Sequence, residues 1–172
     1  MKKIILFSLV AVGLLNSIAG CAQQDKSQRP SPPDSVSQTT NSGLIITINY
    51  SQPGVKGRTI GKEIAPFGKV WRTGANEATT FEVSKNATIE GQPLPAGKYS
   101  LYTIPGENEW TIIFNKTWKQ WGTVYKVEED VLRVKVKPGK SPSFTEKMTF
   151  AIDKSGKVSL MWGDTQVNFT VK

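Results

Sequence analysis

The feature that most constrains the fold is an alternation of apolar and polar side chains with a period of two. Such alternation places apolar side chains on one face of a β-strand and polar side chains on the other. It recurs in five segments, which are residues 44–50, 132–137, 148–152, 158–162 and 167–171. Residues 111–114 are apolar on both faces, as is typical of a central strand. The chain is therefore predicted to be rich in short strands.

Turn-forming residues separate these strands, and they support an antiparallel arrangement. Strong turn signals occur at residues 53–54, 105–108, 154–156 and 163–164, while residues 94–97 end one strand and start the next. Apart from one possible helical turn over residues 118–121, no helix is indicated. A parallel sheet would need crossover helices. We therefore predict an all-β fold, an antiparallel β-sandwich of about eight to nine strands.

The amino-terminal residues have the pattern of an export signal. Two lysines precede an apolar run of about 12 residues, and a bilayer-spanning helix needs roughly 20. Residues 18–21, Ile-Ala-Gly-Cys, then resemble the lipobox of bacterial lipoproteins. That resemblance implies cleavage after residue 20 and acylation of Cys21 by a diacylglycerol. In the alternative interpretation, Cys21 is an incidental thiol behind an ordinary signal peptide.

An acylated Cys21 would make the membrane a partner of this protein. Each buried methylene of a fatty chain such as palmitate contributes about 0.8 kcal/mol to anchoring. Ala22 follows the cysteine, where aspartate favours retention in the inner membrane of some lipoprotein systems. We therefore expect a lipid-anchored protein of the cell envelope, on the outer membrane and facing the periplasm.

The segment after the lipobox differs in composition from the rest of the chain. Gln, Ser, Thr, Pro and Asn dominate residues 22–43, and only Ala22 and Val36 are apolar. Such a segment buries too little apolar surface to offset its loss of conformational entropy. We predict a signal peptide over residues 1–20, a disordered tether over residues 21–43 and a folded domain over residues 44–172. A flexible tether of this length reaches roughly 25 Å.

Composition excludes several classes of chemistry. The chain has no histidine and one cysteine, so it contains no His-based triad, His-containing zinc site, internal disulfide or Cys-x-x-Cys pair. We predict no cofactor and no metal. The formal charge is +8, but an exported protein does not meet cytoplasmic nucleic acid, so we expect no nucleic-acid partner. Anionic headgroups, acidic polysaccharide or no particular partner would each be consistent with the charge.

The densest polar cluster lies in residues 67–80, and glycine-punctuated loops of this kind often carry binding sites. Together with two upstream cations, the candidate ligand-binding residues are Lys56, Arg58, Trp71, Arg72, Asn76 and Glu77. Arginine, carboxylate and amide groups beside an indole could hold a sugar or a carboxylate. Alternatively, Arg72 and Glu77 form a buried pair that fixes the loop, with Trp71 in the core. For Trp118 and Trp121, a stacking platform and simple packing are equally favoured.

Several strings resemble the bacterial family known as domain of unknown function 2911. The resemblance covers about residues 44–172, and the string Trp-Arg-Thr-Gly-Ala-Asn-Glu at residues 71–77 is highly specific. Further matching blocks are residues 50–58, 94–105, 109–116, 121–122 and 130–133. The resemblance implies export, often as a lipoprotein. It carries over no catalytic residue, because the family has no assigned activity.

Three functions are consistent with these observations. The one we favour is a non-catalytic binding module for a small polar ligand, a glycan or an envelope protein. The second is a carboxylate-based hydrolase of envelope glycan, for which acids remain available at Glu77, Glu107, Glu109 and Asp130. The third is a structural envelope protein whose sheet face or edge docks onto a larger assembly.

Overall fold

The computed structural model describes residues 25–172 of the 172-residue chain. Cys21, the predicted export signal and residues 22–24 lie outside the described residues. Within residues 25–172 the only helices are two short 3-10 helices, η1 (Lys26–Gln28) and η2 (Val127–Glu129). None of the helices in this part of the chain is long and apolar enough to cross a membrane.

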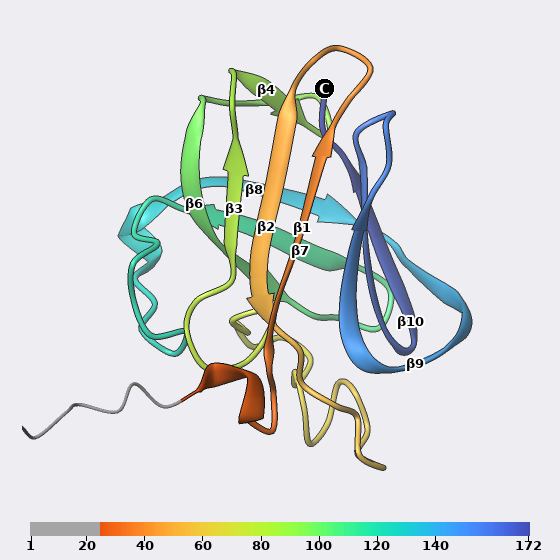
Figure 1. The fold of residues 1–172 in the computed structure, drawn as a ribbon. Helices are drawn as coiled ribbons and strands as arrows, with labels where there is room; N and C mark the ends of the chain where they lie inside the picture. Colours follow the sequence, from red (N-terminus) through yellow and green to blue (C-terminus); the bar gives the residue numbers. More distant parts are fainter. Residues whose placement is uncertain (1–24) are drawn as a thin grey trace, which may run out of the picture.

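Six antiparallel strands form the main sheet. In spatial order they are β1 (Pro33–Thr39), β2 (Ile45–Ser51), β3 (Thr80–Val83), β6 (Gly97–Ile104), β7 (Trp110–Asn115) and β8 (Asp130–Val136). Figure 1 shows the axes of the antiparallel strands β1, β2 and β3 nearly aligned, while β7 and β8 cross behind them at a steep angle. This change of direction is the accumulated right-handed twist of neighbouring strands.

The second layer is a long ribbon of two antiparallel strands, β9 (Pro138–Ile152) and β10 (Lys157–Thr170). It lies on the right of Figure 1, with β1 beside it. A small hairpin, β4 (Ala87–Ile89) and β5 (Gln92–Leu94), completes the strands. The last residues of the chain join this hairpin to the ribbon, because Thr88 and Lys172 exchange backbone hydrogen bonds with N–O distances of 2.6 and 2.9 Å.

A single apolar core lies between the sheet and the ribbon. The alternating pattern explains its composition: Ile46, Ile48 and Tyr50 of β2 point inward, whereas Ile45 is exposed. Phe81 and Phe114 meet edge to face at 4.9 Å in the middle of this core. Burial of each large apolar side chain stabilises the fold by about 1.5–3 kcal/mol. The predicted all-β antiparallel fold is confirmed.

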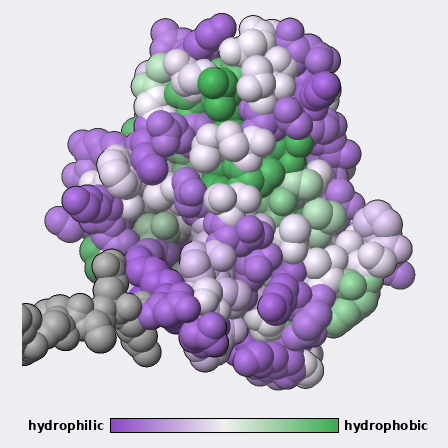
Figure 2. Space-filling view, viewed as in Figure 1, coloured by the Kyte–Doolittle hydropathy of each residue, from purple (hydrophilic) through white to green (hydrophobic). Residues whose placement is uncertain are grey.

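The outward face of the sheet is polar, as the alternation predicts. Figure 2 shows that the side presented by β1, β2 and β3 is largely hydrophilic, with hydrophobic residues gathered in its upper half. Ser37 and Thr47 form a cross-strand hydrogen bond of 2.8 Å on adjacent strands.

The prediction of a disordered tether over residues 21–43 is wrong for the part that the structure describes. Strand β1 pairs with β2 along its whole length, from Pro33 opposite Ser51 to Thr39 opposite Ile45. Val36 packs against the core. An edge strand exposes one face and needs few apolar residues, so composition alone underestimates its order.

Two local predictions are also wrong. Residues 163–164 are not a turn but part of β10, where the pairing register shifts on both sides of Gly163. Gly163 has a φ of +57°, and the extra residues of this irregularity lie on β9, where residues 140–149 pair with residues 161–165 of β10 in a continuous ribbon. Residues 118–121 form no helical turn, because Trp121 instead makes an isolated β-bridge with Glu77.

Candidate functional site

Residues 76–78, in the middle of the polar cluster, lie between two other segments of the chain. On one side, the Ala78 N–H donates to the Gln120 carbonyl and the Gly122 N–H donates to the Asn76 carbonyl, each at 3.0 Å. On the other side, Asn76 Nδ2 donates to the Ser31 carbonyl at 3.0 Å. The cluster therefore joins the amino-terminal segment to the loop that follows β7.

Glu77 holds this amino-terminal segment by charge. Lys26 Nζ lies 2.9 Å from Glu77 Oε1, and Arg29 Nη1 donates to both carboxylate oxygens at 3.1 and 3.0 Å. The hydrogen bond from Lys26 is the main cause that lowers the pKa of Glu77 to about 2. Glu77 thus pairs with Lys26 and Arg29, and the alternative prediction of a buried Arg72–Glu77 pair is wrong.

Trp71 packs into the core on one side and opens onto a cavity on the other. Its ring stacks on Trp162 with centroids 5.1 Å apart and an interplanar angle of 9°. Trp110 meets it edge to face at 6.4 Å. Trp71 is held in the sheet region by two backbone hydrogen bonds with Thr103, of 2.7 and 2.9 Å. Its ring is therefore fixed in orientation.

Arg72 lines the same cavity, which has a volume of about 200 Å³. The lining residues are Val70, Trp71, Arg72, Tyr102, Gly122, Thr123 and Tyr125. Within residues 25–172, no carboxylate lies within ion-pair distance of the Arg72 guanidinium. Its one hydrogen bond there runs from Nε to the Gly74 carbonyl at 3.3 Å. Gly122 lies close over Arg72: a Cβ on this glycine would be 2.5 Å from Arg72 Cδ.

The two tyrosines of the cavity are held by hydrogen bonds. Tyr102 donates to the Val124 carbonyl at 2.7 Å and accepts from Gln120 Nε2 at 3.1 Å. Tyr125 donates to Asp130 Oδ2 at 2.6 Å. Burial and the bond to Asp130 raise the pKa of Tyr125 to about 12, so its phenol stays neutral at physiological pH.

Asp130 is anchored on its other side as well. Arg133 Nε donates to Asp130 Oδ2 at 2.8 Å, and Arg133 Nη2 donates to the Tyr125 hydroxyl at 2.8 Å. The Asp130 side chain is only 9% exposed, so this carboxylate is a structural partner of Tyr125 and Arg133. Among the predicted candidate acids, Glu109 also has a cation partner, Lys135 at 2.9 Å.

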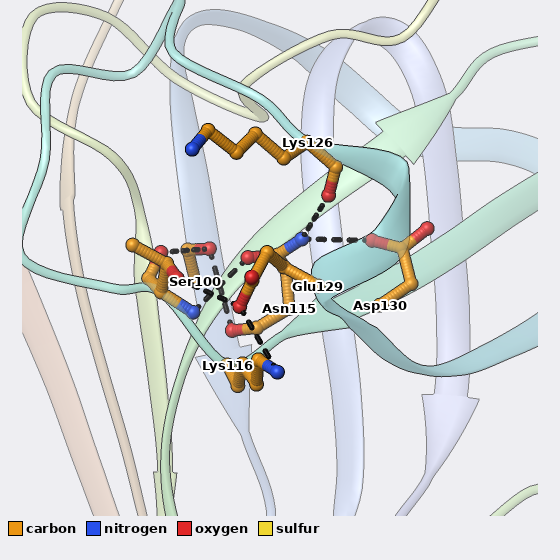
Figure 3. Close-up of polar contacts among 7 residues, drawn as sticks. Ser100, Asn115, Lys116, Lys126, Glu129 and Asp130 are labelled. Atoms are coloured by element: carbon orange, nitrogen blue, oxygen red, sulfur yellow. Dashed lines mark hydrogen bonds and ion pairs between the residues drawn. The ribbon is translucent and has the colours of Figure 1, made fainter.

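Asn115 fixes the loop that carries Gly122, Thr123 and Tyr125. Its side chain is fully buried at the end of β7, and Nδ2 donates to the Lys126 carbonyl and to Asp130 Oδ1, each at 2.9 Å (Figure 3). Its Oδ1 accepts from the Thr117 N–H at 3.1 Å. Ser100 Oγ of β6 donates to the Thr117 carbonyl at 3.0 Å. The wall of the cavity is thereby tied to two strands of the sheet.

Lys56 and Arg58, the two upstream candidates, do not line this cavity. Arg58 donates to the carbonyls of Gly54 and Val55 at 2.8 and 3.1 Å, which closes its own turn. The backbone N–H of Lys56 donates to Glu146 Oε1 of β9 at 2.9 Å. Of the six predicted residues, the structure thus brings only Trp71 and Arg72 to the cavity, and it places Asn76 and Glu77 against the amino-terminal segment.

Sequence reasoning missed Tyr102 and Tyr125. Tyr102 lies in β6 among apolar residues and reads as core, and Tyr125 lies in a loop without a recognisable motif. They meet edge to face at 4.9 Å only because the 116–130 loop folds back over the sheet. No local sequence pattern encodes that contact.

A second cavity, of about 330 Å³, contains two acids. Glu107 and Asp164 line it together with Phe67, Trp110 and Lys140. Within residues 25–172, no group of three or more His, Cys, Asp or Glu side chains is arranged to hold a metal ion.

Comparison with known proteins identifies the family. The family described as "Protein of unknown function (DUF2911)" matches residues 31–171, which include β1 as well as the predicted domain. Neither a curated protein nor a solved structure matches the chain. With most of its length matched, over a range that includes the Trp71–Glu77 string, the chain belongs to the DUF2911 family.

Proposed function

We propose that this protein is a lipid-anchored, exported binding protein that holds a small anionic ligand against Trp71, Arg72, Tyr102 and Tyr125. The observation that carries the proposal is the Arg72 guanidinium, which lines an aromatic cavity without a carboxylate partner among residues 25–172. Arginines in partly buried positions normally have such a partner. A ligand carboxylate or phosphate would supply it.

The cavity lining defines the rest of the ligand. Aromatic faces stack on sugar rings and other planar groups, and the neutral phenols of Tyr102 and Tyr125 leave Arg72 as the charged group of the lining. A volume of about 200 Å³ limits the ligand to one small molecule or one terminal unit of a polymer. A sugar acid, from free metabolite or envelope glycan, combines the anion and the ring.

Anchoring at Cys21 is the other half of the proposal, and the sequence of residues 1–21 supports it. Intact-mass measurement of the protein from a bacterial membrane fraction should give a chain that begins at Cys21 and carries fatty acyl groups. A Cys21→Ser protein should leave the membrane fraction. A full-length, unacylated chain in the cytosol would contradict the proposal.

Ligand binding is tested with glucuronic acid as the probe and glucose as its neutral analogue. Isothermal titration should detect binding of glucuronic acid but not of glucose. Arg72→Gln should weaken the binding of glucuronic acid about tenfold or more, equivalent to about 1.4 kcal/mol. Arg72→Lys keeps the charge but loses the planar guanidinium group, so its affinity for glucuronic acid should lie between those of wild type and Arg72→Gln. The matched control is Lys137→Gln, which removes a cation from an exposed position. Equal affinity of Arg72→Gln and wild type would contradict the assignment.

A second candidate function follows from the pair of acids in the cavity of about 330 Å³. Glu107 and Asp164 line it beside Phe67 and Trp110, and glycosidases use two carboxyl groups across the scissile bond. If the protein is a hydrolase, it should release reducing ends from envelope polysaccharide. Glu107→Gln and Asp164→Asn should then each lower the rate by about a hundredfold or more. Absence of any release by wild type would eliminate this candidate.

A further inference from the structure

Exposed apolar side chains concentrate in one segment of the domain. Nine large apolar residues within residues 25–172 are exposed, and five of them lie in residues 118–131. The four in the loop before β8 are Trp118 (39% exposed), Trp121 (50%), Val124 (47%) and Val127 (59%). We call residues 118–127 the apolar loop. In Figure 1 it is part of the teal segment on the left of the domain.

The apolar loop lies beside the point where the chain enters the domain. Trp121 makes a β-bridge with Glu77, and Glu77 is the residue that binds Lys26 and Arg29. The amino-terminal segment is further fixed through Ser31 and Asn76. The first described residues and the apolar loop therefore occupy the same end of the molecule.

The chain leaves little distance between this end and Cys21. Only residues 22–24 separate Cys21 from Asp25, and four residues span at most about 14 Å even when fully extended. A fatty acyl group on Cys21 inserts into a bilayer, so the bilayer surface must come this close to Asp25. An acylated Cys21 would therefore hold the domain next to the membrane by its amino-terminal end, and not at the end of a tether of 23 residues.

We propose that the apolar loop contacts the lipid bilayer, with Trp118 and Trp121 in the headgroup layer. This inference rests on the acylation of Cys21 put forward under the proposed function. Tryptophans gather at the boundary between headgroups and acyl chains, because the indole is apolar but carries an N–H. Lys119 and Lys126 belong to the same loop, and neither has an ion-pair partner within residues 25–172, which leaves both free to meet lipid phosphates.

The test uses the full mature protein from the membrane fraction, reconstituted into phosphatidylcholine–phosphatidylglycerol vesicles. An acylated Cys21 has no thiol, so a cysteine introduced elsewhere is the only labelling site. An environment-sensitive fluorophore is attached in Trp121→Cys, in Val127→Cys and in Ile45→Cys. Ile45 is the matched control, because it is similarly exposed but lies opposite Thr39, at the other end of the β1–β2 pair from Pro33.

Lipids carrying a nitroxide quencher near the headgroup should lower the emission at positions 121 and 127 about twofold more than at position 45. Equal quenching at all three positions would overturn the inference. So would labels at 121 and 127 that are shielded from water without responding to the lipid quencher, because a protein would then cover the loop. Val127→Cys keeps the test valid if Trp121→Cys fails to fold.

Failure of the anchoring itself gives a different result. Wild-type protein with an unmodified Cys21 would react with a thiol-specific maleimide, and it would not remain with the vesicles during flotation. Anchored wild type without a reactive thiol, together with uniform quenching, contradicts the orientation alone.

Discussion

At the level of single residues, Glu77 connects the amino-terminal segment to the rest of the domain. It accepts hydrogen bonds from Lys26 and Arg29, and its backbone bridges Trp121. Its side chain is 42% exposed, so solvent screens both ion pairs, and together they stabilise the segment by about 1 kcal/mol.

The low pKa of Glu77 gives a pH-dependent prediction. A carboxyl group whose pKa is lower in the folded state stabilises that state above its unfolded pKa, and the contribution is lost as pH falls through the folded pKa. The difference in melting temperature between wild type and Glu77→Gln should be constant above pH 4.5 and should vanish as pH approaches about 2. Glu128→Gln is the control at an exposed acid. A difference that does not change with pH would contradict this origin.

A second prediction for a single residue concerns the contribution of Asn115 to stability. Its amide is fully buried and satisfies the Lys126 carbonyl, Asp130 and the Thr117 N–H. Asn115→Ala leaves all three without their partner, which should lower the free energy of unfolding by about 2–4 kcal/mol, measured by urea denaturation. Asn108→Ala, at an exposed turn, should change it by less than about 0.5 kcal/mol. Similar losses for both would contradict the role of this network.

The residues of the candidate site were only partly predictable from sequence. Trp71 and Arg72 were found because they stand in a dense polar string with glycine. Asn76 and Glu77 stand in the same string, but their partners Lys26, Arg29 and Ser31 come from about 45–51 residues earlier in the chain. A contact of that kind depends on where the folded sheet places the amino-terminal segment, and the spacing of residues within the 71–77 string does not predict it.

At the level of the elements, β1 is the informative one. The sequence predicts the inner strands well, because their alternation or continuous apolar character shows directly which faces are buried. β1 has one inward apolar residue, Val36, and its order derives from backbone pairing with β2. Because its composition is polar, this strand of seven residues was not predicted, and the folded region extends well before residue 44.

Removal of β1 should expose the edge of β2. A chain that begins at residue 44 should have a lower urea midpoint than one that begins at residue 25, and it should self-associate through the unpaired backbone of β2. Size-exclusion chromatography and urea denaturation measure both effects. A chain that begins at residue 32 keeps β1 but drops η1, and it should remain monomeric. An equally stable, monomeric chain from residue 44 would show that β1 contributes little.

At the level of the whole molecule, both sheets share one core, which joins residues from Leu44 to Val171. Such a domain should unfold in a single transition. Thermal unfolding followed by tryptophan fluorescence, which reports Trp71, Trp110 and Trp162 in or beside the core, should coincide with unfolding followed by far-ultraviolet circular dichroism. Two separated transitions would indicate that the β9–β10 ribbon unfolds independently.

The backbone pair between Thr88 and Lys172 has a consequence for biosynthesis. The ribbon that covers the core is built from the last quarter of residues 25–172, and Lys172 itself pairs with the β4 hairpin. A polypeptide emerging from the ribosome therefore cannot complete its core until β9 and β10 have been synthesised. For a chain exported as proposed above, this delay would keep the polypeptide loosely folded while it passes through a narrow translocation channel.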